Sequence, residues 1–197
     1  GNCIMYSDGS KSKNIEPFRM ELEYLNKILD TIRSHVQSIT RNRKSNWDYY
    51  NDFIKYIKKI DYKFVIDGAN IGRLEQGNKS NKDLNFKQIR LIVEKCISSM
   101  PVSKQEKNII VILNENHLKK ISYVDREHID YLRENTIIYE TPRGIDDDLF
   151  WLYAAVFKQD AYLVTTDELR NHIHTINGNF LQWKKYNRIT VSFNKQK

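Results

Sequence analysis

The sequence predicts an α/β fold, in which a mainly parallel sheet is flanked by helices and preceded by a helical N-terminal segment. The chain has 197 residues, of which 40% are hydrophobic, and this is enough for one core of ordinary size. Short apolar runs of strand length alternate with segments in which apolar residues recur at helical spacing. Such alternation is typical of crossover units, which build parallel sheets.

The first 60 residues are predicted to be helical. Apolar residues recur every three or four positions over Phe18–Ile39 and again over Trp47–Ile57. We interpret the basic run between them, residues 41–44, as a solvated loop. The predicted organisation is therefore a helical N-terminal segment, residues 1–60, which would be the remnant of a larger module, and an α/β domain, residues 61–197.

After Asp61 the pattern changes to strands separated by helices. Five runs have the length and composition of strands: Tyr62–Ile66, Asn108–Leu113, Thr136–Tyr139, Ala161–Thr165 and Ile189–Phe193. Four segments between them have helical periodicity: Phe86–Met100, Asp125–Arg133, Leu149–Phe157 and Glu168–Ile176. Because strands and helices alternate, the strands should be parallel, with functional groups gathered at their carboxyl ends.

Composition excludes several classes of protein. The 32 Lys and Arg residues outnumber the 25 Asp and Glu residues, and the resulting charge of +7 suits a polyanionic partner such as nucleic acid. No run of 18 or more apolar residues is present and no signal peptide is recognised, so no membrane partner is expected. The two cysteines, Cys3 and Cys96, form no C-x-x-C pair, so no zinc site is expected from this chain alone.

Acidic residues follow three of the predicted strands. Asp67 ends the first strand, Asp146–Asp148 follow the third, and Asp167 ends the fourth. If these strands are parallel neighbours, the carboxylates converge on one edge of the sheet. Carboxylates brought together repel one another and raise one another's pKa, unless a cation lies between them. Ligands that offer only oxygen select Mg²⁺ or Mn²⁺, so the pattern predicts a site for one or two such ions.

Each of these acids also has a structural alternative. Asp67-Gly68 is a common turn dipeptide. Asp146–Asp148 and Asp167 could cap the helices that follow them. Each alternative is favoured when an acid is taken singly, but acids at three strand ends together favour a metal site. The chain has no Walker A loop and no G-x-G-x-x-G motif, so phosphodiester hydrolysis is the reaction class that fits a metal site on a basic protein.

Four sequence blocks carry a resemblance to a known family. They are FVIDGANIG at 64–72, GIDDDLFWLYAA at 144–155, LVTTDELRNH at 163–172 and FLQWK at 180–184. Together they resemble the metallonuclease domain of protein-only RNase P, which has a PIN-like (NYN), Rossmann-like fold. The resemblance implies a Mg²⁺-dependent endoribonuclease that removes the 5′ leader of precursor tRNA, leaving a 5′ phosphate on the tRNA.

The resemblance also assigns roles to individual residues. The metal ligands and catalytic residues would be four aspartates: Asp67, Asp147, Asp148 and Asp167. One carboxylate of the Asp147–Asp148 pair would orient the attacking water. A second group would line or support the site: Asn70, Asp146, Arg170 and His172. For His172, a structural hydrogen bond near a helix end is an equal alternative.

The chain departs from the family pattern in several places. Thr166 stands where the family usually has Asn, and Asn187-Arg188 where it has His-Gln. The family's zinc module would need C-x-x-C near the start, where only Cys3 is present, so Cys3 would be a remnant and no zinc is expected. The pentatricopeptide repeats with which the family binds tRNA are not recognised in this sequence. The expected partners are therefore precursor tRNA and a pentatricopeptide-repeat domain, in the full-length protein or in a partner.

Two other functions remain open from the sequence. Another NYN or PIN-like endoribonuclease, acting on mRNA or on structured RNA, would share the four aspartates but should lack the last three blocks. A catalytically silent RNA-binding subunit would keep the fold and should have lost an acid, and none of the four is lost here. The mitochondrion, a plastid-type organelle and the nucleus are all compatible with the sequence.

Overall fold

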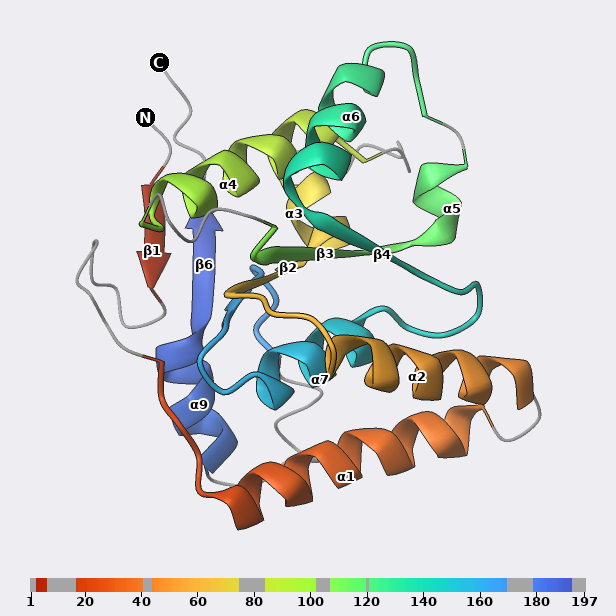
Figure 1. The fold of residues 1–197 in the computed structure, drawn as a ribbon, viewed down its shortest axis with the longest axis vertical. Helices are drawn as coiled ribbons and strands as arrows, with labels where there is room; N and C mark the ends of the chain where they lie inside the picture. The colour runs from red at the N-terminus through yellow and green to blue at the C-terminus, as the bar shows by residue number, and fades with distance from the viewer. Residues whose placement is uncertain are drawn as a thin grey trace.

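The computed structural model of the chain describes residues 3–6, 17–40, 44–74, 84–101, 107–119, 121–169 and 179–192. Within these ranges, a six-stranded sheet separates two layers of helices (Figure 1). Helices α4 (Phe86–Ser98) and α6 (Arg126–Asn135) cover one face. Helices α1 (Leu22–Ile39), α2 (Lys44–Ile57) and α7 (Asp148–Phe157) lie on the other. The predicted α/β fold class is confirmed.

The sheet has the strand order β1-β6-β5-β2-β3-β4. Its strands are β1 (Cys3–Tyr6), β2 (Phe64–Asp67), β3 (Ile109–Asn114), β4 (Ile137–Thr141), β5 (Tyr162–Val164) and β6 (Arg188–Ser192). The five strands from β6 to β4 are parallel, as predicted, whereas β1 pairs antiparallel with β6. Strand β1 was not predicted, because four residues whose only partner is at the other end of the sequence leave no local pattern.

Helix α7 is buried on every side. All residues from Leu149 to Val156 are buried, which is expected of a helix that packs against a sheet on one side and helices on the other. Its packing partners include β2 and β5 above it and α1 and α2 below it. The Tyr62 hydroxyl donates to the Ala154 carbonyl at 2.9 Å and so ties α7 to the start of β2. The position of α7 under the sheet is therefore fixed.

Helices α1 and α2 belong to the same hydrophobic core as α7. The stripe that α1 buries consists of Leu25, Ile28, Leu29, Ile32 and Val36, and α2 contributes Tyr50, Phe53, Ile54 and Ile57. These periodic positions are the ones that predicted the two helices. A boundary near residue 60 stays a prediction, since one core spans both sides of it.

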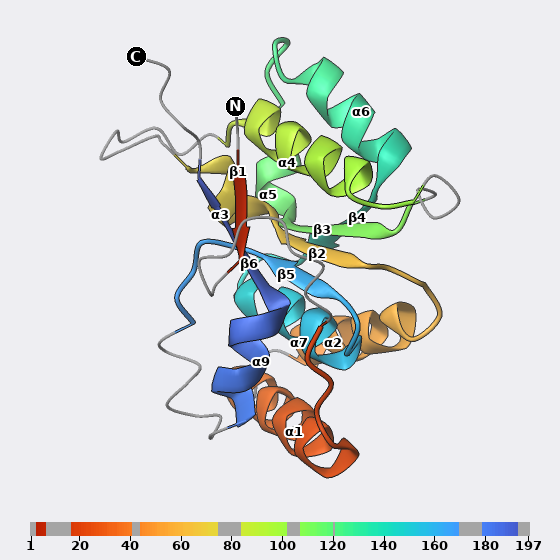
Figure 2. The same cartoon turned by 90° about the vertical axis from the view of Figure 1, so that its left-hand side faces the viewer.

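A buried amide connects the start of the chain with its end. The Asn187 Oδ1 atom accepts the Phe18 N–H at 2.9 Å. The Asn187 Nδ2 atom donates to the carbonyls of Gln159 and Ala161 at 3.2 and 3.3 Å. Asn187 ends α9 (Asn179–Asn187), which lies on the same side of the sheet as α7 and leads into β6 (Figure 2). Three distant segments therefore meet at one side chain.

Two short helices begin directly where strands of the sheet end. Helix α3 (Gly68–Gly72) begins directly after β2, and α5 (Glu115–Leu118) directly after β3. Neither has the length at which apolar periodicity is recognisable in a sequence. None of the described helices has both the length and the apolar composition that a membrane span requires.

The predicted helix over Glu168–Ile176 is wrong at its beginning. Glu168 and Leu169 are not helical, and Leu169 has a φ of 53°, in the left-handed region. The Leu169 N–H donates to Asp167 Oδ1 at 2.5 Å, and its side chain is buried in the core, so the chain turns sharply here. Residues 170–178 lie outside the described residues.

We predict that Gly68→Ala destabilises the protein. A Cβ at Gly68 would lie 2.6 Å from Leu113 Cδ2 and 3.0 Å from the Ile112 carbonyl oxygen, so α3 or β3 must shift. Overpacking of this kind costs about 1–3 kcal/mol. The melting temperature should fall by roughly 2–4 °C for each kcal/mol.

The matched test is a double-mutant cycle with Leu113→Ala, measured by thermal denaturation. Leu113→Ala alone removes a fully buried side chain and should also destabilise. Because it removes the Leu113 atoms, which are the two nearest to the new Cβ, the double variant should lose less than the sum of the two single variants. Additive losses would contradict this explanation.

Candidate metal centre

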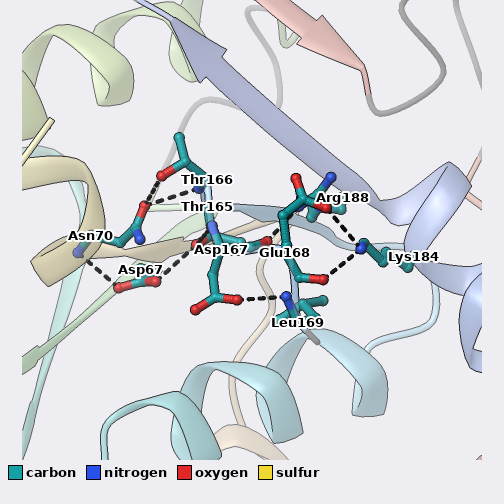
Figure 3. Close-up of polar contacts among 9 residues, drawn as sticks. All are labelled: Asp67, Asn70, Thr165, Thr166, Asp167, Glu168, Leu169, Lys184 and Arg188. Carbon is teal, nitrogen blue, oxygen red and sulfur yellow. Dashed lines mark hydrogen bonds and ion pairs between the residues drawn. The ribbon is translucent and has the colours of Figure 1, made fainter. Parts of the chain in front are cut away.

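Asp67 lies at the carboxyl end of β2, in the middle of the sheet. It is only 3% exposed. Its Oδ1 accepts the Asn70 N–H at 3.1 Å and caps α3, while its Oδ2 accepts the Thr165 hydroxyl at 2.9 Å (Figure 3). Thr165 follows β5, which pairs with β2 in parallel. The carboxylate is thus held between two neighbouring strand ends.

Asp167 lies at the same edge of the sheet, in the turn that follows β5. Its backbone N–H donates to Thr165 Oγ1 at 3.1 Å, and its Oδ1 accepts the Leu169 N–H. Its Oδ2 has no hydrogen-bond partner among the described residues. Figure 3 shows both aspartates next to Thr165, whose hydroxyl group links Asp67 to the backbone of Asp167. These two aspartates are brought together by direct strand pairing, as the sequence predicted.

The acidic run 146–148 is not placed in the site by the end of a neighbouring strand, as the sequence suggested. Its strand, β4, is at the edge of the sheet and is separated from β2 by β3, so the two strands are not neighbours. After β4 the chain returns beneath the sheet into α7, which packs on β2. Asp147 is the N-cap residue of α7 and Asp148 its first residue. The N-terminus of a buried helix, and not a strand end, therefore carries these acids to the site.

All the predicted aspartates line one cavity of about 480 Å³. Among the described residues, its lining is Asp67, Ala69, Asn70, Arg73, Leu74, Asp146, Asp147, Asp148, Thr166 and Asp167. Carboxylate oxygens of the three acids of the 146–148 run lie within 4.8 Å of one another. The structure therefore brings together Asp67, Asp147, Asp148 and Asp167, with Asn70 and Asp146 beside them. Their assignment as metal ligands stays a prediction.

The electrostatics of this cavity are unfavourable for carboxylates. Burial, reinforced by the charge of Asp148, raises the pKa of Asp67 from its ordinary value of 3.8 to about 8. Burial, followed by the charges of Asp148 and Asp146, raises the pKa of Asp147 to about 6. The Asp147 Oδ2 atom is buried and has no hydrogen-bond partner among the residues that the structure describes. A buried oxygen of this kind costs free energy unless something outside the described chain binds it.

The structural alternatives explain some of these acids but not all. Asp67 caps α3, and Asp167 closes the turn that follows β5, so each has a local role for one oxygen. Asp147 occupies the N-cap position of α7 but makes no capping hydrogen bond with its side chain. Its unpartnered oxygen, next to carboxylates from two other segments, fits a hard divalent cation, because every side-chain donor in the acidic cluster is oxygen.

Two threonines at the end of β5 were overlooked by the sequence analysis as functional residues. The buried Thr165 hydroxyl links Asp67 to the backbone of Asp167. Thr166 donates both its N–H, at 2.9 Å, and its hydroxyl to Asn70 Oδ1. The departure from the family pattern at Thr166 therefore fixes the Asn70 amide. The only signal was the position of these hydroxyls directly before an acid at a strand end.

Arg73 is a third residue that the sequence did not indicate. It follows α3, is exposed, and lines the acidic cavity. Its guanidinium makes no hydrogen bond or ion pair with another described residue, although its charge lowers the pKa of Asp147, as a lesser influence than burial. It is therefore a cation at the rim of the site that is not committed to the fold. No motif pointed to it.

Three predicted residues cannot be placed in the site. Arg170 and His172 lie outside the described residues, and so does the side chain of Cys3. The backbone of Cys3 begins β1, at the edge of the sheet opposite β4.

Comparison with known proteins decides the family. The profile of the protein-only RNase P family matches residues 8–197, nearly the whole sequence. The chain belongs to this family. The four aspartates of the acidic cavity all lie within the matched region. The resemblance seen in the sequence blocks is thereby confirmed.

Individual relatives of this chain are found in Arabidopsis thaliana. Proteinaceous RNase P 3 is 32% identical over 152 residues, which are 73% of this chain and 25% of the relative. Proteinaceous RNase P 2 is 30% identical over 149 residues, 73% of this chain and 27% of the relative. The chain thus spans about a quarter of the length of the curated relatives that it matches.

A solved structure confirms the fold of this family member. The crystal structure of nuclear proteinaceous RNase P 2 from Arabidopsis thaliana superposes with a TM-score of 0.74 and 24% sequence identity. The match covers 100% of this chain and 40% of that chain. The helices α1 and α2 are included in the match together with the sheet, so the architecture described above is that of the matched part of the solved relative.

We predict that Asp67→Asn stabilises the metal-free protein at neutral and higher pH. The pKa of Asp67 in the folded protein is about 8, above its ordinary 3.8, so its contribution to stability is fully present below pH 3.8 and is lost as the pH rises through 8. An Asn side chain can still accept the Asn70 N–H and can donate to Thr165, without a buried charge. The gain in melting temperature over the parent should therefore be larger at pH 8 than at pH 5.

The measurement is thermal denaturation in the presence of a chelator. Asp130→Asn, on the exposed surface of α6, is the matched control and should shift the melting temperature equally at both pH values. If Asp67→Asn lowers the melting temperature by the same amount at pH 5 and pH 8, the carboxylate is not a destabilising charge in this fold.

Proposed function

We propose that this chain is the nuclease part of a protein-only RNase P, which hydrolyses a phosphodiester bond to remove the 5′ leader of precursor tRNA. We further propose that Asp67, Asp147, Asp148 and Asp167 hold Mg²⁺ or Mn²⁺, with two ions in the site. The observation that carries the proposal is the cavity in which buried and half-buried carboxylates from three segments face one another in a basic chain of this family.

Divalent ions bound in this cavity would polarise the phosphoryl group and supply an activated water at neutral pH. The protein's own residues have other tasks. Asp67 is held by two hydrogen bonds, so its carboxylate is fixed before any ligand arrives. One carboxylate of the Asp147–Asp148 pair would orient the attacking water and accept its proton. Because α7 is buried along its length, this pair is presented from a rigid element.

Two groups at the cavity suit the phosphate of a substrate. The guanidinium of Arg73 has no hydrogen-bond or ion-pair partner among the described residues and can donate to non-bridging phosphate oxygens. Thr166 occupies the Oδ1 atom of Asn70, so Nδ2 is the amide atom that remains available to a ligand. Acids that would hold cations and donors that would meet the phosphate thus line the same cavity.

The substrate and the partner are taken from the relatives and the family. The Arabidopsis proteins that match this chain are named proteinaceous RNase P. Phosphate contacts position a nucleic acid but do not specify it, so a domain of net charge +7 binds RNA with little selectivity of its own. We therefore propose that a pentatricopeptide-repeat domain, in the full-length protein or in a partner, selects precursor tRNA.

The deciding experiment is a cleavage assay with mapped product ends. The chain is incubated with Mg²⁺ and either a precursor tRNA or an unrelated hairpin RNA. Cleavage of the precursor at the mature 5′ end, leaving a 5′ phosphate on the tRNA, supports the proposal. Equal cleavage of both RNAs would favour an endoribonuclease of broader substrate range. RNA binding without metal-dependent cleavage would favour the silent subunit.

Replacing Asp147 should separate catalysis from stability. We expect Asp147→Ala to lower the cleavage rate by about 10²-fold or more, because the loss of metal-based charge stabilisation amounts to several kcal/mol. The metal-free variant should melt no lower than the parent, since the substitution removes a buried oxygen that has no partner and relieves repulsion.

The control for this prediction is Asp130→Ala, which removes the same charge from the surface of α6. It should leave both cleavage and melting temperature close to those of the parent. Cleavage by Asp147→Ala at the parent's rate would refute the assignment of Asp147, whatever its melting temperature.

Arg73→Gln should impair the reaction without affecting the fold. A charge-assisted hydrogen bond to phosphate contributes about 1.5–3 kcal/mol, so kcat/KM should fall roughly 10- to 100-fold. The guanidinium has no partner within the described structure, so the melting temperature should not fall. Steady-state kinetics and thermal denaturation of the same preparation check both parts, and unchanged kcat/KM would show that Arg73 does not contact the substrate.

A further inference from the structure

The turn that carries Asp167 is not part of a regular element. It follows β5 and contains two local hydrogen bonds, from the Asp167 N–H to Thr165 Oγ1 and from the Leu169 N–H to Asp167 Oδ1. It places Leu169 in the left-handed region at a φ of 53°. A non-glycine residue keeps such a conformation only when its surroundings impose it. Something beyond the turn itself must therefore hold it in place.

Arg188 is the first residue that holds this turn from outside. It begins β6 and is 5% exposed. Its Nη1 atom donates to the backbone carbonyl of Asp167 and, at 3.1 Å, to Glu168 Oε1 (Figure 3). A buried guanidinium is thus directed at the backbone of a proposed metal ligand, from a strand that pairs with β5 in parallel.

Lys184 holds the next residue of the same turn. Its Nζ atom, on α9, donates to the Glu168 carbonyl at 2.5 Å and to Glu168 Oε2 at 3.0 Å. Two consecutive carbonyls and one carboxylate are therefore bound by two cations from the α9–β6 segment. Figure 3 shows Arg188 and Lys184 on the Glu168 side of the turn, away from Asp67 and Asn70.

Stability alone does not account for this arrangement. Glu168 is exposed, and ion pairs at exposed groups contribute little. Arg188 is buried with its Nε atom unpartnered, which is unfavourable, and an apolar side chain of similar size would fill the same space without that cost. What an apolar side chain could not do is bind the carbonyl of Asp167.

We propose that Arg188 is a positioning residue, which, with Lys184, fixes the backbone of Asp167 so that its carboxylate faces the other aspartates of the cavity. This inference rests on the proposed function in so far as Asp167 binds a metal there. It assigns to the α9–β6 segment a role in metal affinity, although neither Arg188 nor Lys184 touches the cavity.

The test is a titration of the full 197-residue chain with Mn²⁺ alone. Electron paramagnetic resonance measures the free ion at each step and so gives the affinity. We expect Arg188→Met to weaken Mn²⁺ binding about 10-fold, the lower end of the range for residues that orient metal ligands. Arg188→Lys keeps the charge and one donor and should bind with intermediate affinity. Lys158→Met is the matched control, because it also removes one positive charge and one ion pair, to Asp61, away from the turn.

The direction of the effect separates positioning from charge. Removing a cation near carboxylates should tighten Mn²⁺ binding if only charge matters. Weaker binding by Arg188→Met, with parental affinity in Lys158→Met, supports the proposal, and equal or tighter binding by Arg188→Met overturns it. All titrations are made well below the melting temperature of each variant. If Arg188→Met does not fold, Arg188→Lys decides the question, and parental affinity in that variant overturns the proposal.

Cleavage measured in parallel distinguishes this inference from the proposed function. If the parent binds Mn²⁺ but does not cleave precursor tRNA, the proposed function fails while weaker binding by Arg188→Met still supports the positioning role. If the parent cleaves and Arg188→Met needs no more Mn²⁺ than the parent for half-maximal cleavage, the positioning role is overturned and the proposed function stands. A parent that binds no Mn²⁺ overturns both.

Discussion

The burial of the Asp67 carboxylate is the constraint on which the rest of the site depends. A carboxylate that is 3% exposed, beside other acids, is stable as an anion only if hydrogen bonds or cations compensate it. Asn70 and Thr165 supply two hydrogen bonds, but the pKa of Asp67 still rises to about 8. The fold therefore holds an unfavourable arrangement in place, as expected where a ligand supplies the missing positive charge.

The apolar core provides the free energy that maintains this arrangement. Helix α7 begins with two of the acids and continues as an entirely buried segment between the sheet and the helices α1 and α2. If those two helices did not cover it, α7 would expose its apolar surface and the acids at its N-terminus would not be fixed. The N-terminal helices thus support the site without contributing a side chain to the cavity lining.

The C-terminal segment has a comparable supporting role on the other side of the site. Asn187 connects α9 with the chain before α1, and Arg188 connects β6 with the turn of Asp167. Both are positions at which the sequence is expected to depart from the family pattern, and both are buried with polar contacts to distant segments. The departures are therefore built into the fold and are not surface variation.

The sequence by itself determined the α/β class, the five parallel strands and the long helices, and it predicted that the four aspartates converge at one edge of the sheet. These features depend on local periodicity and on short motifs, which are readable without coordinates. The tertiary structure alone decided how the acids meet, because β4 is not a neighbour of β2 and the 146–148 run is carried to the site by α7. It alone revealed Thr165, Arg73 and Arg188, because their roles arise from contacts between segments distant in sequence. A hydrogen bond across the sheet leaves no periodic trace in either of the segments that make it.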